Sequence, residues 1–211
     1  MRQYQRFWIL SLLRGIETAG LAPLPLKEVN ALAYLANAVA PCFDLEPMTY
    51  TVLKEREGPL YPELIWNIDR LVGMGLVRVS NLVLTGASVK SVSYSITERG
   101  LEIIARCRGA SKRFDIVSDA LHSVALAFSR HPNSMENKNL LAYDGNYANS
   151  KYGLGDVVDF GAWDAENSTG DAIETVKKEC WGQAQLPTSM AVNLYADYLA
   201  SASSAQSVEA S

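Results

Sequence analysis

The chain has 211 residues, of which 48% are hydrophobic and 20% are charged, a composition typical of one elaborated globular domain or two small ones. Its net charge of −4 and pI near 5.3 argue against a free-standing general DNA-binding protein, although they allow a local basic patch. No apolar run reaches the roughly 18–20 residues of a membrane span. Charges at Arg14 and Glu17 interrupt the apolar start, so we expect a cytoplasmic protein rather than a secreted one.

The cysteines and histidines do not form a recognisable metal or redox motif. Cys42, Cys107 and Cys180 lie far apart without a C-x-x-C, which indicates reduced thiols. His122 and His131 do not combine with them at any familiar zinc-ligand spacing. We therefore expect neither a metal nor another cofactor.

Two helices are expected at the start of the chain. Apolar residues recur at helical spacing over 4–18 and again over 26–40, and prolines follow both stretches. The stretch 41–60 is rich in proline and glycine, which predicts a loop with a short strand near 48–53.

The stretch GPLYPELIWNIDRLVGMGLV predicts a third helix. Pro62 suits its first turn, where a missing N–H costs nothing, and Gly73 and Gly75 supply a C-terminal stop. Five leucine, isoleucine and valine side chains between them fall on one stripe. The side chains expected on the exposed face are Glu63, Trp66, Asn67, Asp69 and Arg70.

A hairpin and a fourth helix follow. The expected ranges are a strand over 77–84, a turn over 85–88, a strand over 92–96 and a helix over 98–108. The apolar alternation slips across Ser80-Asn81, which predicts a bulge, and Thr97 can cap the helix. Helix, helix, loop, helix, hairpin, helix is the order of a winged-helix domain. We therefore expect a mainly α protein with a small β-hairpin and a winged-helix domain at 1–110.

The rest of the chain predicts a mostly helical region over 111–200 and a disordered tail over 201–211. Helices are expected at 112–130, 169–179 and 188–202, with a polar loop at 131–139 and short irregular elements over 140–166.

Acidic residues gather in this second region. They are Asp144, Asp156, Asp159, Asp164, Glu166, Asp171 and Glu174. A metal-dependent nuclease is one hypothesis, but Glu174 and Lys177 are three apart on an expected helix, whereas the nuclease pattern needs two apart on a strand. The alternative is that the acids cap helices and pin turns. Because the sequence also lacks a phosphate-binding loop and a nucleophile elbow, we expect no enzymatic activity.

The third helix offers mixed chemistry to DNA. Asn67 and Arg70 are of the types that contact base edges, whereas Glu63 and Asp69 would be repelled by phosphate. The candidate nucleic-acid contacts are Arg78, Lys90, Lys112 and Arg113. The last two form a basic cluster with Arg106 and Arg108, which either touches a DNA backbone nonspecifically or only solvates a helix end.

The same helix also offers a protein-binding surface. Trp66 lies off the apolar stripe near an arginine, and an exposed tryptophan of this kind anchors many interfaces. The alternative is that Trp66 packs beneath the later part of the same chain. The candidate partner-binding residues are Glu63, Trp66, Asn67 and Arg70.

Two family resemblances arise from these segments. GPLYPEL, GMGLV and YSITERG resemble PadR-type winged-helix repressors over about 45 residues. This resemblance implies a DNA-binding transcriptional regulator that dimerises through its C-terminal helices.

A longer resemblance covers most of residues 10–175. LLRGIETAGLAPLPLKEVNALAYLANAVAPCFDL, VLKEREGPLYPELIWNIDRLVGMGLV and AYDGNYANSKYGLGDVVDFGAW resemble the middle component of bacterial ABC-three-component systems. That group includes the small accessory subunit of Lamassu-type defence complexes.

The longer resemblance implies a non-catalytic winged-helix subunit of an anti-phage or anti-plasmid complex. Its expected partners are a coiled-coil, SMC-like ABC ATPase and a nuclease effector, with possible nonspecific double-stranded DNA contact through the complex. The resembled subunits are similar to the partners of SMC proteins that carry two winged-helix domains in tandem. A second such domain would have to lie in 111–211, and the sequence there shows no winged-helix pattern. No small-molecule substrate and no membrane contact are expected.

Overall fold

The computed structural model of the chain describes residues 2–85, 88–131, 140–148, 152–160, 167–179 and 186–209. Within these residues the protein is mainly helical, with two small antiparallel sheets. The helices are α1 (Arg2–Thr18), α2 (Leu26–Val39), α3 (Pro62–Gly73), α4 (Glu98–Ala110), α5 (Lys112–Ser129), α7 (Gly145–Ala148), α8 (Ser168–Glu179) and α9 (Thr188–Glu209), with 3-10 turns η1 (Ala40–Phe43) and η2 (Leu140–Tyr143). None of these described helices combines the length and the apolarity needed to cross a membrane.

The strands form two separate three-stranded sheets. They are β1 (Leu24–Pro25), β2 (Thr51–Glu55), β3 (Gly58–Leu60), β4 (Val77–Thr85), β5 (Ser88–Ile96) and β6 (Val157–Asp159). The first sheet has the order β1-β5-β4 and the second has the order β3-β2-β6.

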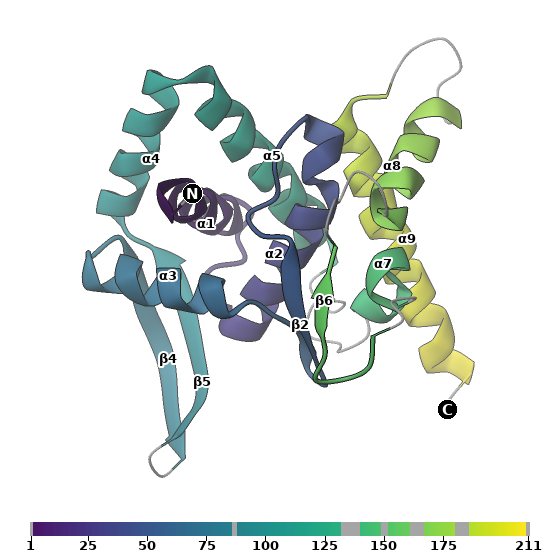
Figure 1. Cartoon of the computed structure of the whole chain (residues 1–211), viewed down its shortest axis with the longest axis horizontal. Coiled ribbons are helices and arrows are strands. Elements are labelled where there is room, and N and C mark those ends of the chain that lie inside the picture. Colours follow the sequence, from purple (N-terminus) through teal and green to yellow (C-terminus); the bar gives the residue numbers. More distant parts are fainter. Residues whose placement is uncertain are drawn as a thin grey trace.

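Helix α1 lies at the centre of the N-terminal part. Its side chains Trp8, Leu12 and Leu13 are almost fully buried, and α3, α4, α5 and β5 all pack against it. Figure 1 shows α1 nearly end-on, with α4 beside it and the β4–β5 ribbon projecting below. The helix expected over 4–18 is confirmed, as is the second helix to within one residue.

The bulge expected in the first strand of the hairpin is confirmed. The β4–β5 register shifts between Ser80 and Val83, and Asn81 adopts a left-handed φ of 51°. The short strand β1 pairs with β5 through Leu24↔Tyr94 and Pro25↔Ser93. The turn expected at 85–88 includes residues 86 and 87, which lie outside the described residues.

Helix α3 begins and ends where the sequence predicts. Pro62 occupies its first turn, and Leu64, Ile68 and Leu71 are buried on one face. The chain leaves the helix through Gly75, whose φ of 71° favours glycine. Thr97 then caps α4, because its hydroxyl accepts a hydrogen bond from the N–H of Gly100 at 3.1 Å.

The stretch 41–60 differs from the loop with one strand that we expected. It contains the β2–β3 hairpin, and β2 begins three residues later than predicted, at Thr51. Strand β6 from the C-terminal region completes this sheet through Val52↔Val158. Both valines are buried, so this pairing joins segments more than 100 residues apart in the sequence.

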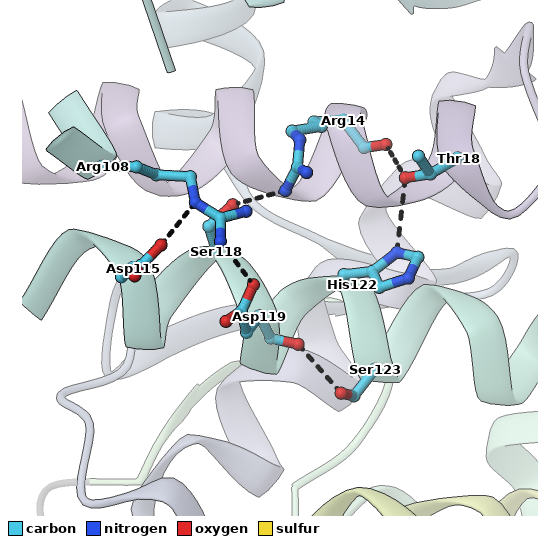
Figure 2. A network of polar contacts seen from close by, with 8 residues as sticks. All are labelled: Arg14, Thr18, Arg108, Asp115, Ser118, Asp119, His122 and Ser123. Carbon is cyan, nitrogen blue, oxygen red and sulfur yellow. Dashed lines mark hydrogen bonds and ion pairs between the residues drawn. The ribbon is translucent and has the colours of Figure 1, made fainter. Parts of the chain in front are cut away.

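Helix α5 packs closely along α1. A Cβ on Gly15 would lie 3.1 Å from the backbone of His122 and of Leu121, so the two helices approach backbone to backbone at that point. Figure 2 shows polar contacts between the two helices, in which Arg14 donates to the Ser118 hydroxyl at 2.9 Å and Thr18 contacts His122 at 3.3 Å. A single hydrophobic cluster therefore includes residues from both sides of position 110.

The tail expected to be disordered from residue 201 instead continues α9 to Glu209. Ala200 and Ser203 are buried, so the helix is still held by packing where the small polar tail begins. Residues 201–209 are alanine, serine, glutamine, valine and glutamate without glycine or proline, and none of these stops an established helix.

Candidate functional site

The exposed face of α3 has a tryptophan at its centre. Trp66 is 56% exposed, and the Arg70 guanidinium lies 4.8 Å from the centroid of its indole ring. This spacing of four residues places both side chains on one face, and such a stacked pair contributes about 0.5–1 kcal/mol at an exposed site. Glu63 and Asp69 are also exposed. The face therefore combines a large aromatic ring with charges of both signs.

Trp66 is not packed beneath the C-terminal region. Figure 1 shows α3 beside the β4–β5 ribbon, on the opposite side of the molecule from α8 and α9. The 56% exposure of Trp66 agrees with this placement and contradicts the alternative in which the ring packs beneath the later part of the same chain.

Asn67 is not on the exposed face as expected, because only 8% of it is accessible. Its side-chain oxygen accepts a hydrogen bond from Arg6 at 3.3 Å, and its amide nitrogen donates to the Glu63 carbonyl at 2.8 Å. Asn67 follows Leu64 by three residues and precedes Leu71 by four, which places it on the buried stripe. Its amide is therefore used within the chain instead of facing a base edge.

The hairpin beside α3 is apolar near its end. Leu82, Val83 and Leu84 are 55%, 47% and 59% exposed. Arg78 is exposed on β4, and Lys90 lies in β5 with a side chain outside the described residues. Among the hairpin side chains that the structure describes, Arg78 is therefore the cation available to a DNA phosphate.

Two of the four cations in the expected basic cluster form ion pairs with acidic side chains of the chain itself. Arg108 forms ion pairs with Asp115 at 2.5 Å and with Asp119 at 3.1 Å, as Figure 2 shows. Arg113 lies 3.5 Å from the carboxylate of Glu46, and its guanidinium is 6.0 Å from the Tyr4 ring. Lys112 and Arg106 are exposed. These pairs favour the interpretation of a solvated helix end, with two cations left available to a polyanion.

Asp144 lies at the centre of a buried polar cluster. Its carboxylate accepts hydrogen bonds from the hydroxyls of Tyr34 at 2.8 Å, Tyr195 at 2.9 Å and Thr169 at 2.6 Å. The backbone N–H of Tyr147 donates a fourth bond at 2.9 Å. Burial, reinforced by the nearby carboxylate, raises the pKa of Tyr34 and of Tyr195 well above 10, which keeps both hydroxyls protonated as donors. Asp144 therefore holds α2, α7, α8 and α9 together.

Other acids of this region have local structural partners. Asp156 accepts a hydrogen bond from the Gly153 N–H at 2.9 Å, and Glu174 pairs with Lys177 at 2.6 Å within α8. Asp164 and Glu166 lie outside the described residues. In the part of the chain that the structure describes, no three histidine, cysteine, aspartate or glutamate side chains are grouped to hold a metal ion. Asp144, Asp156 and Glu174 thus serve the core, a turn and a helix, and Asp171 lies in the first turn of α8.

Sequence reasoning missed the apolar end of the hairpin and the exposed Met74, which is 48% accessible. The slip at Ser80-Asn81 was the available signal, because a bulge bends its strand and so can change which side chains beyond it face the core. Met74 caps the C-terminal end of α3 and lies between the exposed Gly73 and Gly75.

No protein-family model matches this chain, and no curated protein matches it.

Proposed function

We propose that residues 1–110 form a winged-helix domain that holds a protein partner, and that the chain is a non-catalytic accessory subunit. The domain proposal is supported by the element order helix, strand, helix, helix, hairpin, helix. It is also supported by the sheet order β1-β5-β4, in which the short first strand pairs with the second strand of the hairpin, as in winged helices. The β2–β3 hairpin is then an insertion between the second and third helices.

The observation that carries the proposal is the Trp66–Arg70 pair on the exposed face of α3. Tryptophan and arginine are the residues most enriched among those that dominate binding energies at protein interfaces. Asn67, the other side chain on α3 suited to bases, is used internally, while Glu63 and Asp69 repel phosphate. The apolar hairpin end adds surface that suits a protein better than a polyanion.

The resemblance to the middle component of ABC-three-component systems supplies the identity of the partners. In this proposal the chain belongs to a bacterial anti-phage or anti-plasmid defence complex. It bridges an SMC-like ABC ATPase and a nuclease effector. Any direct DNA contact is nonspecific and uses exposed cations such as Arg78 and Lys112.

The test first asks whether an SMC-like ATPase and a nuclease are encoded beside the gene of this chain, and then measures the affinity of the purified chain for them. Trp66→Ala combined with Arg70→Glu removes the ring and reverses the charge beside it. Loss of one interface anchor of this kind costs about 2 kcal/mol, so we expect the dissociation constant measured by calorimetry to rise roughly 30-fold. The melting temperature should stay nearly unchanged, because both side chains are exposed.

Tyr198→Ala is the matched control, since Tyr198 is 59% exposed on α9, across the molecule from α3. It should leave both affinity and stability unchanged. If neither neighbouring protein binds the unmodified chain, or if Trp66→Ala with Arg70→Glu binds as tightly as the unmodified chain, the proposal is wrong.

A DNA-binding transcriptional regulator is the second candidate, favoured by the winged-helix element order and by the exposed Arg70 and Arg78. It predicts a dimer in solution that binds a defined palindrome tightly at physiological salt. With few cations on this surface, we instead expect weak binding that is lost steeply as salt rises. Fluorescence anisotropy across a salt series distinguishes the two candidates.

A further inference from the structure

A groove of about 580 Å³ lies between the two sheets, and this volume is in the range of peptide and ligand sites. Its lining includes the apolar side chains of Pro25 and Leu26 at the start of α2, Pro59 and Leu60 of β3, and Val92 of β5. Glu63, Trp66 and Arg70 do not line it, so it is separate from the exposed face of α3.

Two sheet edges flank the groove. Within the described residues, β1 pairs with β5 only at Tyr94 and Ser93, so Ser91 and Val92 lie beyond the end of β1 on that side of β5. Strand β3 is the other edge, because the order of its sheet is β3-β2-β6. An open strand edge presents backbone N–H and C=O groups that a further strand can satisfy.

The two edges are not equivalent. Pro59 has no N–H, and a proline on an edge strand prevents continuous pairing. The β5 edge beside Ser91 is the one that can accept a strand, while β3 forms the opposite wall. This arrangement favours an extended backbone in the groove, running along β5 where β1 ends.

The charges at the groove favour a basic occupant. Glu55 and Glu57 both line it and are exposed, whereas Lys27 is the basic residue in its lining. The two carboxylates would repel an anionic ligand, whereas the excess of negative charge would attract a cationic one.

We infer that this groove binds an extended segment of a partner protein in which apolar residues alternate with lysine or arginine. The segment adds a strand to β5, places its apolar side chains on the floor between Leu26 and Val92, and pairs its cations with Glu55 and Glu57. This site goes beyond the proposed function, because it uses neither the α3 face nor the hairpin end.

The experiment measures binding of a fluorescent octapeptide of alternating valine and lysine to the full chain by anisotropy. We expect saturable binding, and no binding of the matched octapeptide of valine and glutamate. A valine–lysine peptide with N-methyl groups on alternate residues keeps its side chains but cannot pair, so its binding should weaken at least tenfold. Amide chemical shifts of Ser91, Val92 and Leu60 should move as the first peptide is added.

Glu55→Gln with Glu57→Gln tests the charges. Two exposed ion pairs contribute about 1 kcal/mol together, so the dissociation constant should rise roughly fivefold. Glu17→Gln with Glu102→Gln makes the same change in net charge at exposed positions away from the groove and should have no effect.

Equal binding of the lysine and glutamate peptides, equal binding of the N-methylated peptide, or shifts confined to other residues would each overturn the inference. So would absence of peptide binding, or a concentration-dependent dimer that shifts the same amides, which would make a second copy the occupant. Trp66→Ala with Arg70→Glu should leave peptide binding intact, so failure at the α3 face and failure at the groove are distinguishable.

Discussion

At the scale of single residues, Asp144 shows how one member of an acidic group that suggested a metal site serves the core instead. A metal-binding carboxylate must offer its oxygens to an ion, but both oxygens of Asp144 are used by donors from four segments of the chain. It is also fully buried. The three residues whose hydroxyls donate, Tyr34, Thr169 and Tyr195, are 110, 25 and 51 positions from Asp144, so sequence pattern alone had no means of finding this arrangement.

We predict that Asp144→Ala destabilises the protein by about 3–5 kcal/mol, because it leaves three hydroxyls and one N–H buried without their acceptor. Asp156→Ala is the control and should cost under about 1 kcal/mol, since Asp156 is exposed and accepts from a single turn N–H. Chemical denaturation followed by circular dichroism measures both. An Asp144→Ala protein as stable as the unmodified chain would contradict the structural role.

Trp66 and Asn67 are neighbours that were both expected on the exposed face of α3, whereas in the structure Trp66 is exposed and Asn67 is buried. Asn67 lies three residues after Leu64 and four before Leu71, so helical periodicity could have predicted its burial as well as the exposure of Trp66. Its hydrogen bond from Arg6 of α1 was not predictable, because that contact links residues 61 apart in the sequence.

At the scale of elements, local signals predicted α3, α4 and the bulge of β4 well. Pro62, Thr97 and the slip at Ser80-Asn81 each act through backbone geometry within a few residues. Strand β6 has only three residues and no alternating pattern long enough to identify it. It exists because β2, about 100 residues earlier, offers a strand to pair with. Non-local pairing of this kind leaves little trace in a single sequence.

The β2–β6 pairing predicts different effects for two adjacent valines. Val158 is buried opposite Val52, so Val158→Ala should destabilise by about 1–2.5 kcal/mol through lost burial and a residual cavity. Val157 is 57% exposed on the other face of the same strand, so Val157→Ala should change stability by under about 0.5 kcal/mol. Thermal melts of the two variants make the comparison. Equal effects would mean that β6 is not seated on β2 in this register.

At the scale of the whole molecule, the expected boundary near residue 110 separates the winged-helix pattern from the mostly helical region. It does not separate two hydrophobic cores. Phe7 of α1 and Phe114 of α5 lie with ring centroids 4.4 Å apart, and the Gly15 contact brings the same helices together further along. Strand β6 returns to the N-terminal part as well. The winged-helix proposal therefore describes the order and connection of the elements in residues 1–110. The stability of those elements depends also on residues after position 110.

A fragment that ends at residue 110 should accordingly fail to fold by itself. It lacks Val117, Leu121, Val124 and Phe128, four buried side chains of α5. Each buried side chain of this size contributes about 1.5–3 kcal/mol, so their combined loss is comparable with the roughly 5–15 kcal/mol by which domains are stable. We expect poor amide dispersion and no cooperative melt for 1–110 alone, and recovery of both when 111–211 is co-expressed with it. A cooperative melt of the isolated fragment would show instead that residues 1–110 fold without α5. The α3 face could then be studied on that fragment alone.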